Sequence, residues 1–144
     1  QCRWGAIDID VYNFDHTAFI QKIRKFNLPL ILCRTKSGGA HVFCFTSEFV
    51  PASLMRVKLQ AMASVLGYAK TEIFPKQNSV KAERGDVGNF LNMPYHGGNR
   101  TVRYAIGDDG KSLLRMVLLL KGMGMLQHLV VIMVCLILEY IYEK

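Results

Sequence analysis

Two aspartates near the start of the chain are the residues whose type and spacing best suit chemistry. Residues 6–11 read Ala-Ile-Asp-Ile-Asp-Val, an alternation that predicts a strand with its apolar side chains on one face. Asp8 and Asp10 would then lie side by side on the other face and repel each other at neutral pH. A hard divalent cation such as Mg²⁺ between the two carboxylates would relieve this repulsion. The alternative is an ordinary edge strand with a solvated polar face.

Composition limits the classes to which this chain can belong. Its 144 residues suffice for one domain with a core, and the net charge of +7 suits a polyanionic partner such as nucleic acid or nucleotide. The four cysteines are scattered, without a Cys-x-x-Cys pair, which argues against a zinc site or a disulfide framework and favours a reduced, cytoplasmic setting. Because the first residue is not Met and a strand begins almost at once, we expect a piece of a longer polypeptide.

The spacing of apolar residues, which is strand-like in some stretches and helix-like in others, predicts six elements before residue 75. Asp15 or Asn13 is expected to cap the first helix. The expected elements are strand 6–11, helix 17–26, strand 28–34, strand 40–45, helix 51–67 and strand 71–74. The order β-α-β-β-α-β predicts an α+β fold like that of the RNA-recognition motif, with both helices on one face of the sheet.

In a sheet of this kind, the first and third strands are central neighbours and the fourth lies beside the first. The strand residues expected to face the helices are Ile7, Ile9, Val11, Val42 and Cys44. On the opposite, open face, Asp8 and Asp10 are expected to converge with His41 and Glu72. Three separate segments would thus bring acids and a histidine to one uncovered surface.

The chain beyond residue 74 changes character twice. Residues 75–100 are irregular and polar, and a strand is expected at 101–106. Residues 111–144 form an apolar tail with an unbroken apolar run at 129–138, which is shorter than the roughly 20 residues of a membrane span. We expect a buried or partner-packing helix there and no membrane association. A membrane helix, or a tail that is not the natural continuation of the domain, are the alternatives.

Three ordered motifs resemble those of the archaeo-eukaryotic primase superfamily. They are the strand-borne Asp8-Ile9-Asp10, the hairpin Ser37-Gly38-Gly39-Ala40-His41, and the third motif Glu72-Ile73-Phe74-Pro75-Lys76-Gln77. The later run 88–95 is similar to a segment of primase-polymerases from phages, mobile elements and TOTE conflict systems. The resemblance covers residues 4–110, and we expect residues 1–110 to form the catalytic core.

The resemblance implies nucleotidyl transfer with two divalent ions, Mg²⁺ or Mn²⁺, held by Asp8, Asp10 and Glu72. It also implies that His41 binds the phosphates of the incoming nucleotide. The hairpin adds further candidates for phosphate binding, through exposed amides, a hydroxyl and positive charge: Gly39, Ser37, Lys36 and Arg34.

Weaker candidates follow the third motif. Lys76, Arg100 and Arg103 are candidates for phosphate or template contact. Tyr95 and Phe90 are candidates for stacking on a base, with a place in the core as the alternative for Phe90.

The resulting hypothesis is a primase-polymerase that makes or extends primers from nucleoside triphosphates on a single-stranded DNA template, encoded by a phage or mobile element. A helicase domain or protein is a candidate partner. Two alternatives use similar residues: a metal-dependent nuclease, and a non-catalytic nucleic-acid-binding module in which Phe43 and Phe45, on the face of His41, would stack on bases.

Overall fold

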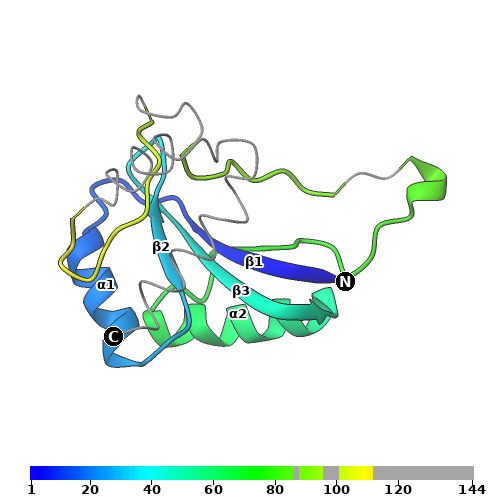
Figure 1. Ribbon diagram of the computed structural model, residues 1–144, viewed down its shortest axis with the longest axis horizontal. Coiled ribbons are helices and arrows are strands. Elements are labelled where there is room, and N and C mark those ends of the chain that lie inside the picture. The colour runs from blue at the N-terminus through cyan, green and yellow to red at the C-terminus, as the bar shows by residue number, and fades with distance from the viewer. Residues whose placement is uncertain (86–87, 96–100, 112–144) are drawn as a thin grey trace, which may run out of the picture.

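A computed structural model of the chain describes residues 1–85, 88–95 and 101–111. The main elements alternate as the sequence predicts (Figure 1). They are β1 (Cys2–Ile9), α1 (His16–Lys25), β2 (Ile31–Arg34), β3 (Ala40–Val50), α2 (Ala52–Leu66) and β4 (Glu72–Phe74), followed by a short 3₁₀ helix, η1 (Ala82–Arg84). The fold is mixed α/β, with both helices on one side of the sheet.

The four strands form one open antiparallel sheet in the order β2-β3-β1-β4. The predicted arrangement, with β1 and β3 in the centre and β4 beside β1, is therefore confirmed. The register pairs Asp8 with His41 on β3 and with Glu72 on β4. Residues directly opposite each other in an antiparallel pair have side chains on the same face, so these three positions share one side of the sheet.

Strand ends differ from the prediction for a reason visible in the pairing. Ile9 pairs with Ala40, the first residue of β3, so no strand continues alongside residues 10 and 11. Asp10 therefore follows β1, and Val11 is 42% exposed, which corrects its predicted place against the helices. At the other end β1 begins at Cys2, and β3 extends to Val50 to pair with it.

Local signals set the helix ends. The Asp15 carboxylate accepts a hydrogen bond of 2.9 Å from the backbone N–H of Ala18, which confirms the predicted cap of α1. Helix α2 begins after Pro51 and ends at Gly67, whose left-handed φ of 91° lets the chain reverse without a side-chain clash.

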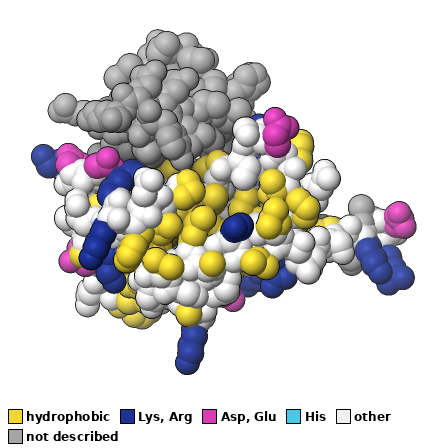
Figure 2. All heavy atoms as spheres, turned by 90° about the horizontal axis from the view of Figure 1, so that it is seen from below, with side chains coloured by type: hydrophobic (Ala, Val, Ile, Leu, Met, Phe, Trp, Pro, Cys, Tyr) yellow, Lys and Arg dark blue, Asp and Glu magenta, His cyan; other side chains and the backbone are white. Residues whose placement is uncertain are grey.

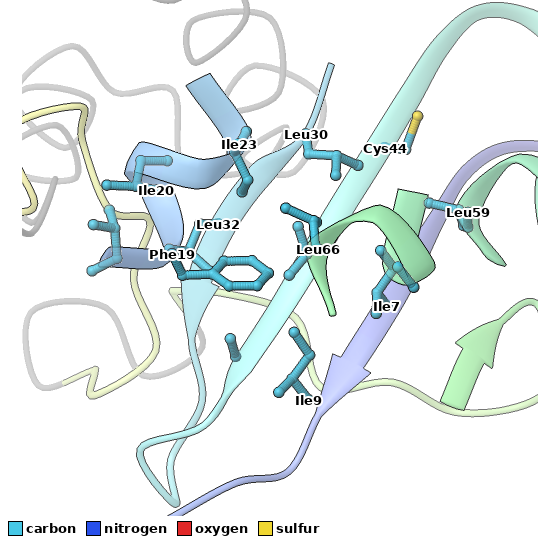
Figure 3. Packing of buried hydrophobic residues seen from close by; sticks show 14 of the residues in the cluster. Ile7, Ile9, Phe19, Ile20, Ile23, Leu30, Leu32, Cys44, Leu59 and Leu66 are labelled. Atoms are coloured by element: carbon cyan, nitrogen blue, oxygen red, sulfur yellow. The ribbon is translucent and has the colours of Figure 1, made fainter. Parts of the chain in front are cut away.

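The main core lies between the helices and the sheet (Figure 3). Ile7 and Ile9 of β1 pack there against Phe19 of α1 and Leu59 and Leu66 of α2, and each of these side chains is at most 3% exposed. Burial of this kind contributes about 1.5–3 kcal/mol for each large apolar side chain. Ile7 and Ile9, which flank Asp8, thus fix which face of β1 is buried.

The solvent side of α2 is apolar as well. Leu54, Val57 and Val65 remain exposed, and apolar side chains gather on this face of the molecule (Figure 2). The helix therefore has a wider apolar surface than its packing against the sheet uses.

The opposite face of the sheet is partly covered, which corrects the expectation of a fully open face. A second apolar cluster joins sheet residues to two residues from beyond β4, and its buried members are Ala6, Ile31, Cys33, Phe43, Phe74, Tyr95 and Ala105. The predicted strand 101–106 is only a short pairing, with a bridge between Cys33 and Ala105 at the edge of β2. Among the described residues, polar side chains line this face at its end near Asp8 and His41.

Within the residues that the structure describes, no helix has the length and apolar character needed to cross a bilayer. The predicted apolar helix of the tail, in residues 112–144, lies outside the described part of the chain.

Gly5 offers a test of the close packing of α2 on β1. A Cβ at this position would lie 2.6 Å from Leu59 Cδ1, 2.7 Å from Met55 Cγ and 2.7 Å from the carbonyl oxygen of Phe74. We expect Gly5→Ala to lower the free energy of unfolding by about 1–3 kcal/mol, as overpacked cores do. Denaturant titration measures this change. Gly88→Ala is the control, because nothing lies within 4 Å of a Cβ at Gly88. Equal stability of the two variants would contradict close packing at Gly5.

Candidate active site

A cavity of about 480 Å³ opens where β1 ends and the β2–β3 hairpin turns. Its wall combines two carboxylates, two cations, an imidazole and three neutral polar groups. The lining residues are Asp8, Asp10, Thr35, Lys36, Ser37, His41, Asn92 and Arg103. Five of the residues singled out by the three motifs and the hairpin therefore share one cavity: Asp8, Asp10, Lys36, Ser37 and His41.

Asp8 and His41 are in direct contact across the β1–β3 pair. His41 Nε2 lies 3.3 Å from Asp8 Oδ1, and the side chains are 12% and 25% exposed, respectively. The contact follows from the register, which places the two residues opposite each other. It fixes the orientation of the imidazole at the cavity wall.

The carboxylates of Asp8 and Asp10 fit a divalent cation. Both line the cavity, and Asp10 is exposed and forms no ion pair with another described side chain. Mg²⁺ is commonly bound by one or two carboxylates, with waters and substrate phosphates as its other ligands. In the described part of the chain, no three His, Cys, Asp or Glu side chains are grouped to hold a metal ion. Asp8 and Asp10 are therefore the two cavity residues that would hold such an ion.

Glu72, predicted as the third metal ligand, does not join them in this structure. Its position is opposite Asp8 in the β1–β4 pair, but Glu72 Oε2 lies 2.7 Å from Lys76 Nζ and its side chain is 60% exposed. Lys76, predicted to contact phosphate or template, is occupied by this ion pair and lies over the ring of Phe74. Neither residue lines the cavity.

The hairpin holds Lys36 and Ser37 at the cavity through its own backbone. Thr35 N donates to the Gly39 carbonyl (3.1 Å), and Gly38, with φ of 93°, donates to the Thr35 carbonyl (3.2 Å). The hydroxyls of Thr35 and Ser37 are 3.0 Å apart. This tight turn leaves the Lys36 and Ser37 side chains exposed to the cavity.

At Gly39, the backbone of the hairpin lies very close to the end of β1. A Cβ there would lie 2.4 Å from the carbonyl oxygen of Ile9, so a side chain would push the hairpin away from the end of β1. The Gly39 carbonyl is also 3.0 Å from His16 Nε2, which joins the hairpin to the start of α1. Gly39 thus brings Lys36 and Ser37 close to Asp10, although it does not line the cavity itself.

Arg34, predicted to supply charge for a triphosphate, has a different place. Its Nη1 donates to the carbonyls of Thr35 and Val102, both at 3.0 Å, and its guanidinium lies over the ring of Tyr104. Its backbone N–H donates to the Tyr104 carbonyl (2.8 Å). Arg34 thus holds residues 102–104 at the edge of β2, and it does not line the cavity.

The two aromatic candidates differ from the prediction in their exposure: Tyr95 is buried and Phe90 is exposed. Tyr95, predicted to stack on a base, is 7% exposed, and its hydroxyl accepts a hydrogen bond from Ala105 N (3.1 Å). Burial raises the pKa of its phenol to about 12, although the bond from Ala105 opposes the shift. Phe90, for which a place in the core is the predicted alternative to base stacking, is 87% exposed. Arg100 lies outside the described residues.

Sequence reasoning did not single out Thr35 or Asn92, and it gave Arg103 only as a weak candidate. Thr35 adjoins the motif-bearing turn, so its position beside Lys36 was a usable signal. Asn92 belongs to the run 88–95 that resembles a segment of primase-polymerases, but no spacing rule links that run to the aspartates. Its place in the cavity depends on how the chain folds back over the sheet.

Comparison with known protein families gives one match. No curated protein matches the chain. Residues 1–112 match the family described as the archaeo-eukaryotic primase domain of TOTE conflict systems. The match includes every strand and helix described above, together with all eight residues that line the cavity. The chain therefore belongs to the archaeo-eukaryotic primase domain family of TOTE conflict systems.

Proposed function

We propose that this domain is a metal-dependent nucleotidyltransferase that makes or extends primers from nucleoside triphosphates on a single-stranded DNA template. The observation that carries the proposal is the joint cavity of Asp8 and Asp10 with Lys36, Ser37 and His41. Membership of a primase domain family supports a role of the nucleotidyltransferase type. The RNA-recognition-motif-like sheet then serves as a catalytic core.

The wall of the cavity offers two kinds of group to such a substrate. Asp8 and Asp10 would hold Mg²⁺ or Mn²⁺, which when bound activates the attacking hydroxyl and stabilises the leaving pyrophosphate. Lys36 supplies positive charge for phosphate oxygens, and Ser37 supplies a hydroxyl donor. The contact of Nε2 with Asp8 orients the His41 ring at the cavity wall, where the side chain would contribute to phosphate binding.

The proposed template is supported by the charge of the chain. The net charge of +7 favours association with a nucleic acid, and base pairing with the template would supply sequence specificity. A helicase domain or protein would be a further partner. The proposed setting is a prokaryotic cell, where the domain would serve the replication of a phage or mobile element.

A non-catalytic nucleic-acid-binding module is less well supported. Such modules stack bases on aromatic side chains of the sheet. Here Phe43 is 1% exposed beneath the cluster that contains Tyr95 and Ala105, so its ring offers no stacking surface. Asp8 and Asp10 at the uncovered end would repel a phosphate backbone without metal.

Removing either cavity carboxylate tests the proposal. We expect Asp8→Asn and Asp10→Asn each to reduce primer extension by about 100-fold or more, because a bound metal ion contributes several kcal/mol to transition-state stabilisation. Incorporation of labelled nucleotides on a primed single-stranded template, with Mg²⁺ and with Mn²⁺, measures the effect. Glu48→Gln is the control, since Glu48 is an exposed acid outside the cavity.

The same assay separates the alternatives. Strand scission without incorporation would indicate a nuclease. If the unaltered chain never incorporates nucleotides, and Asp8→Ala with Asp10→Ala leaves oligonucleotide binding unchanged or stronger, then binding alone is its function.

Glu72 gives a second, graded prediction. Its carboxylate has to leave Lys76 before it can serve as a third metal ligand. We therefore expect Glu72→Gln to reduce incorporation by about tenfold or less, well below the effect of Asp8→Asn, since each tenfold change corresponds to only about 1.4 kcal/mol. Titration of Mn²⁺ in the extension assay provides the comparison. A loss as large as that of Asp8→Asn would mean that Glu72 enters the metal site during the reaction.

A further inference from the structure

We infer that Arg103 binds a phosphate of the incoming nucleotide and that Tyr95 and Thr101 act as positioning residues for it. This inference rests on the proposed function, because it names a further contact of the same substrate. None of the three motifs contains Arg103, which lies 62 residues beyond His41 in the chain. It nevertheless lines the cavity of Asp8 and Asp10.

The backbone of Arg103 is held from both sides. Its N–H donates to Thr101 Oγ1 (3.1 Å), and its carbonyl accepts hydrogen bonds from Tyr95 N (2.7 Å) and from Thr101 Oγ1 (3.0 Å). The next residue, Tyr104, is tied to β2 through its carbonyl, which accepts from Arg34 N (2.8 Å). A side chain on a backbone fixed in this way loses less freedom when it binds a ligand.

Tyr95 anchors this segment to the sheet. Its ring belongs to the cluster of Phe43, Cys33 and Ala105, and its hydroxyl accepts a hydrogen bond from Ala105 N. The residue has a φ of 60°, in the left-handed region, which costs an L-residue roughly 1–2 kcal/mol. Burial and two hydrogen bonds maintain this conformation, and the result is a fixed position for Arg103 at the cavity.

The charges of the cavity indicate what Arg103 binds. In the described part of the chain, no carboxylate or carbonyl accepts a hydrogen bond from its guanidinium. Of the two cavity carboxylates, Asp8 contacts His41, and both are assigned to metal in the proposed function. Arginine stays charged in proteins, and its planar fork matches a phosphate. With metal on the aspartates, Lys36 and Arg103 are left as cations that call for an anionic ligand.

Equilibrium binding of a nucleoside triphosphate and of inorganic tripolyphosphate, both with Mg²⁺, tests Arg103 without turnover. We expect Arg103→Gln to weaken binding of both about tenfold or more, since hydrogen bonds to charged groups contribute about 1.5–3 kcal/mol. Arg103→Lys should recover part of the affinity because it restores charge but not the fork. Binding of a single-stranded oligonucleotide should change much less than triphosphate binding, because Arg103 is assigned to the nucleotide and not to the template.

Arg84→Gln is the matched control. It removes the same charge from an exposed position on η1 that does not line the cavity, and should leave triphosphate binding unchanged. If the unaltered chain binds nucleotide and Arg103→Gln binds it equally well, the inference is wrong and the proposed function stands. If Arg103→Gln weakens only oligonucleotide binding, Arg103 is a template contact and the inference is also wrong. Absence of nucleotide binding by the unaltered chain contradicts both.

A double-mutant cycle tests the positioning role of Tyr95. Tyr95→Phe keeps the buried ring and removes the hydroxyl that accepts from Ala105 N. We expect it to weaken triphosphate binding less than Arg103→Gln does, and to have no further effect when Arg103 is already Gln. Thermal unfolding of each variant shows how much stability is lost. If the effect of Tyr95→Phe on binding is fully additive with Arg103→Gln, Tyr95 does not act through Arg103.

Discussion

The pairing of β1 between β3 and β4 is the constraint on which both the core and the site depend. It buries Ile7 and Ile9 against the helices and leaves Asp8 on the other face, opposite His41 and Glu72. A slip of one residue would exchange the two faces, burying carboxylates under the helices and exposing the isoleucines. The hydrophobic core therefore holds the position of the catalytic candidates.

Much of this arrangement is readable in the sequence because its signals are local. Alternation around Asp8, the cap at Asp15 and the terminating Gly67 each act within a few residues, and each corresponds to an observed feature. The convergence of Asp8 and His41 is also predictable, since element order fixed which strands are neighbours. What periodicity does not supply is the exact strand end, which explains why Val11 was misplaced.

The parts that sequence reasoning missed depend on contacts between distant segments. Nothing local shows that residues 91–95 and 101–105 pack on the sheet, where Tyr95 is buried and Arg34 is hydrogen-bonded to Val102. Glu72 is a different case, because its ion pair with Lys76 spans only four residues. The Glu72 carboxylate could act as a metal ligand or form a local ion pair, and its spacing from Lys76 in the sequence does not decide between these roles.

The covering segment also explains why the site is confined to one end of the sheet. Tyr95 and Ala105 cover Phe43 in the middle of the face, which removes an aromatic platform on which bases could stack. The same segment brings Arg103 and Asn92 to the edge of the uncovered end, beside Asp8 and Asp10. Residues 91–95 and 101–105 thus cover the middle of this face and add polar groups around the carboxylates. Both effects support the proposed role of this end of the sheet as the site of a nucleoside triphosphate with its metal ion.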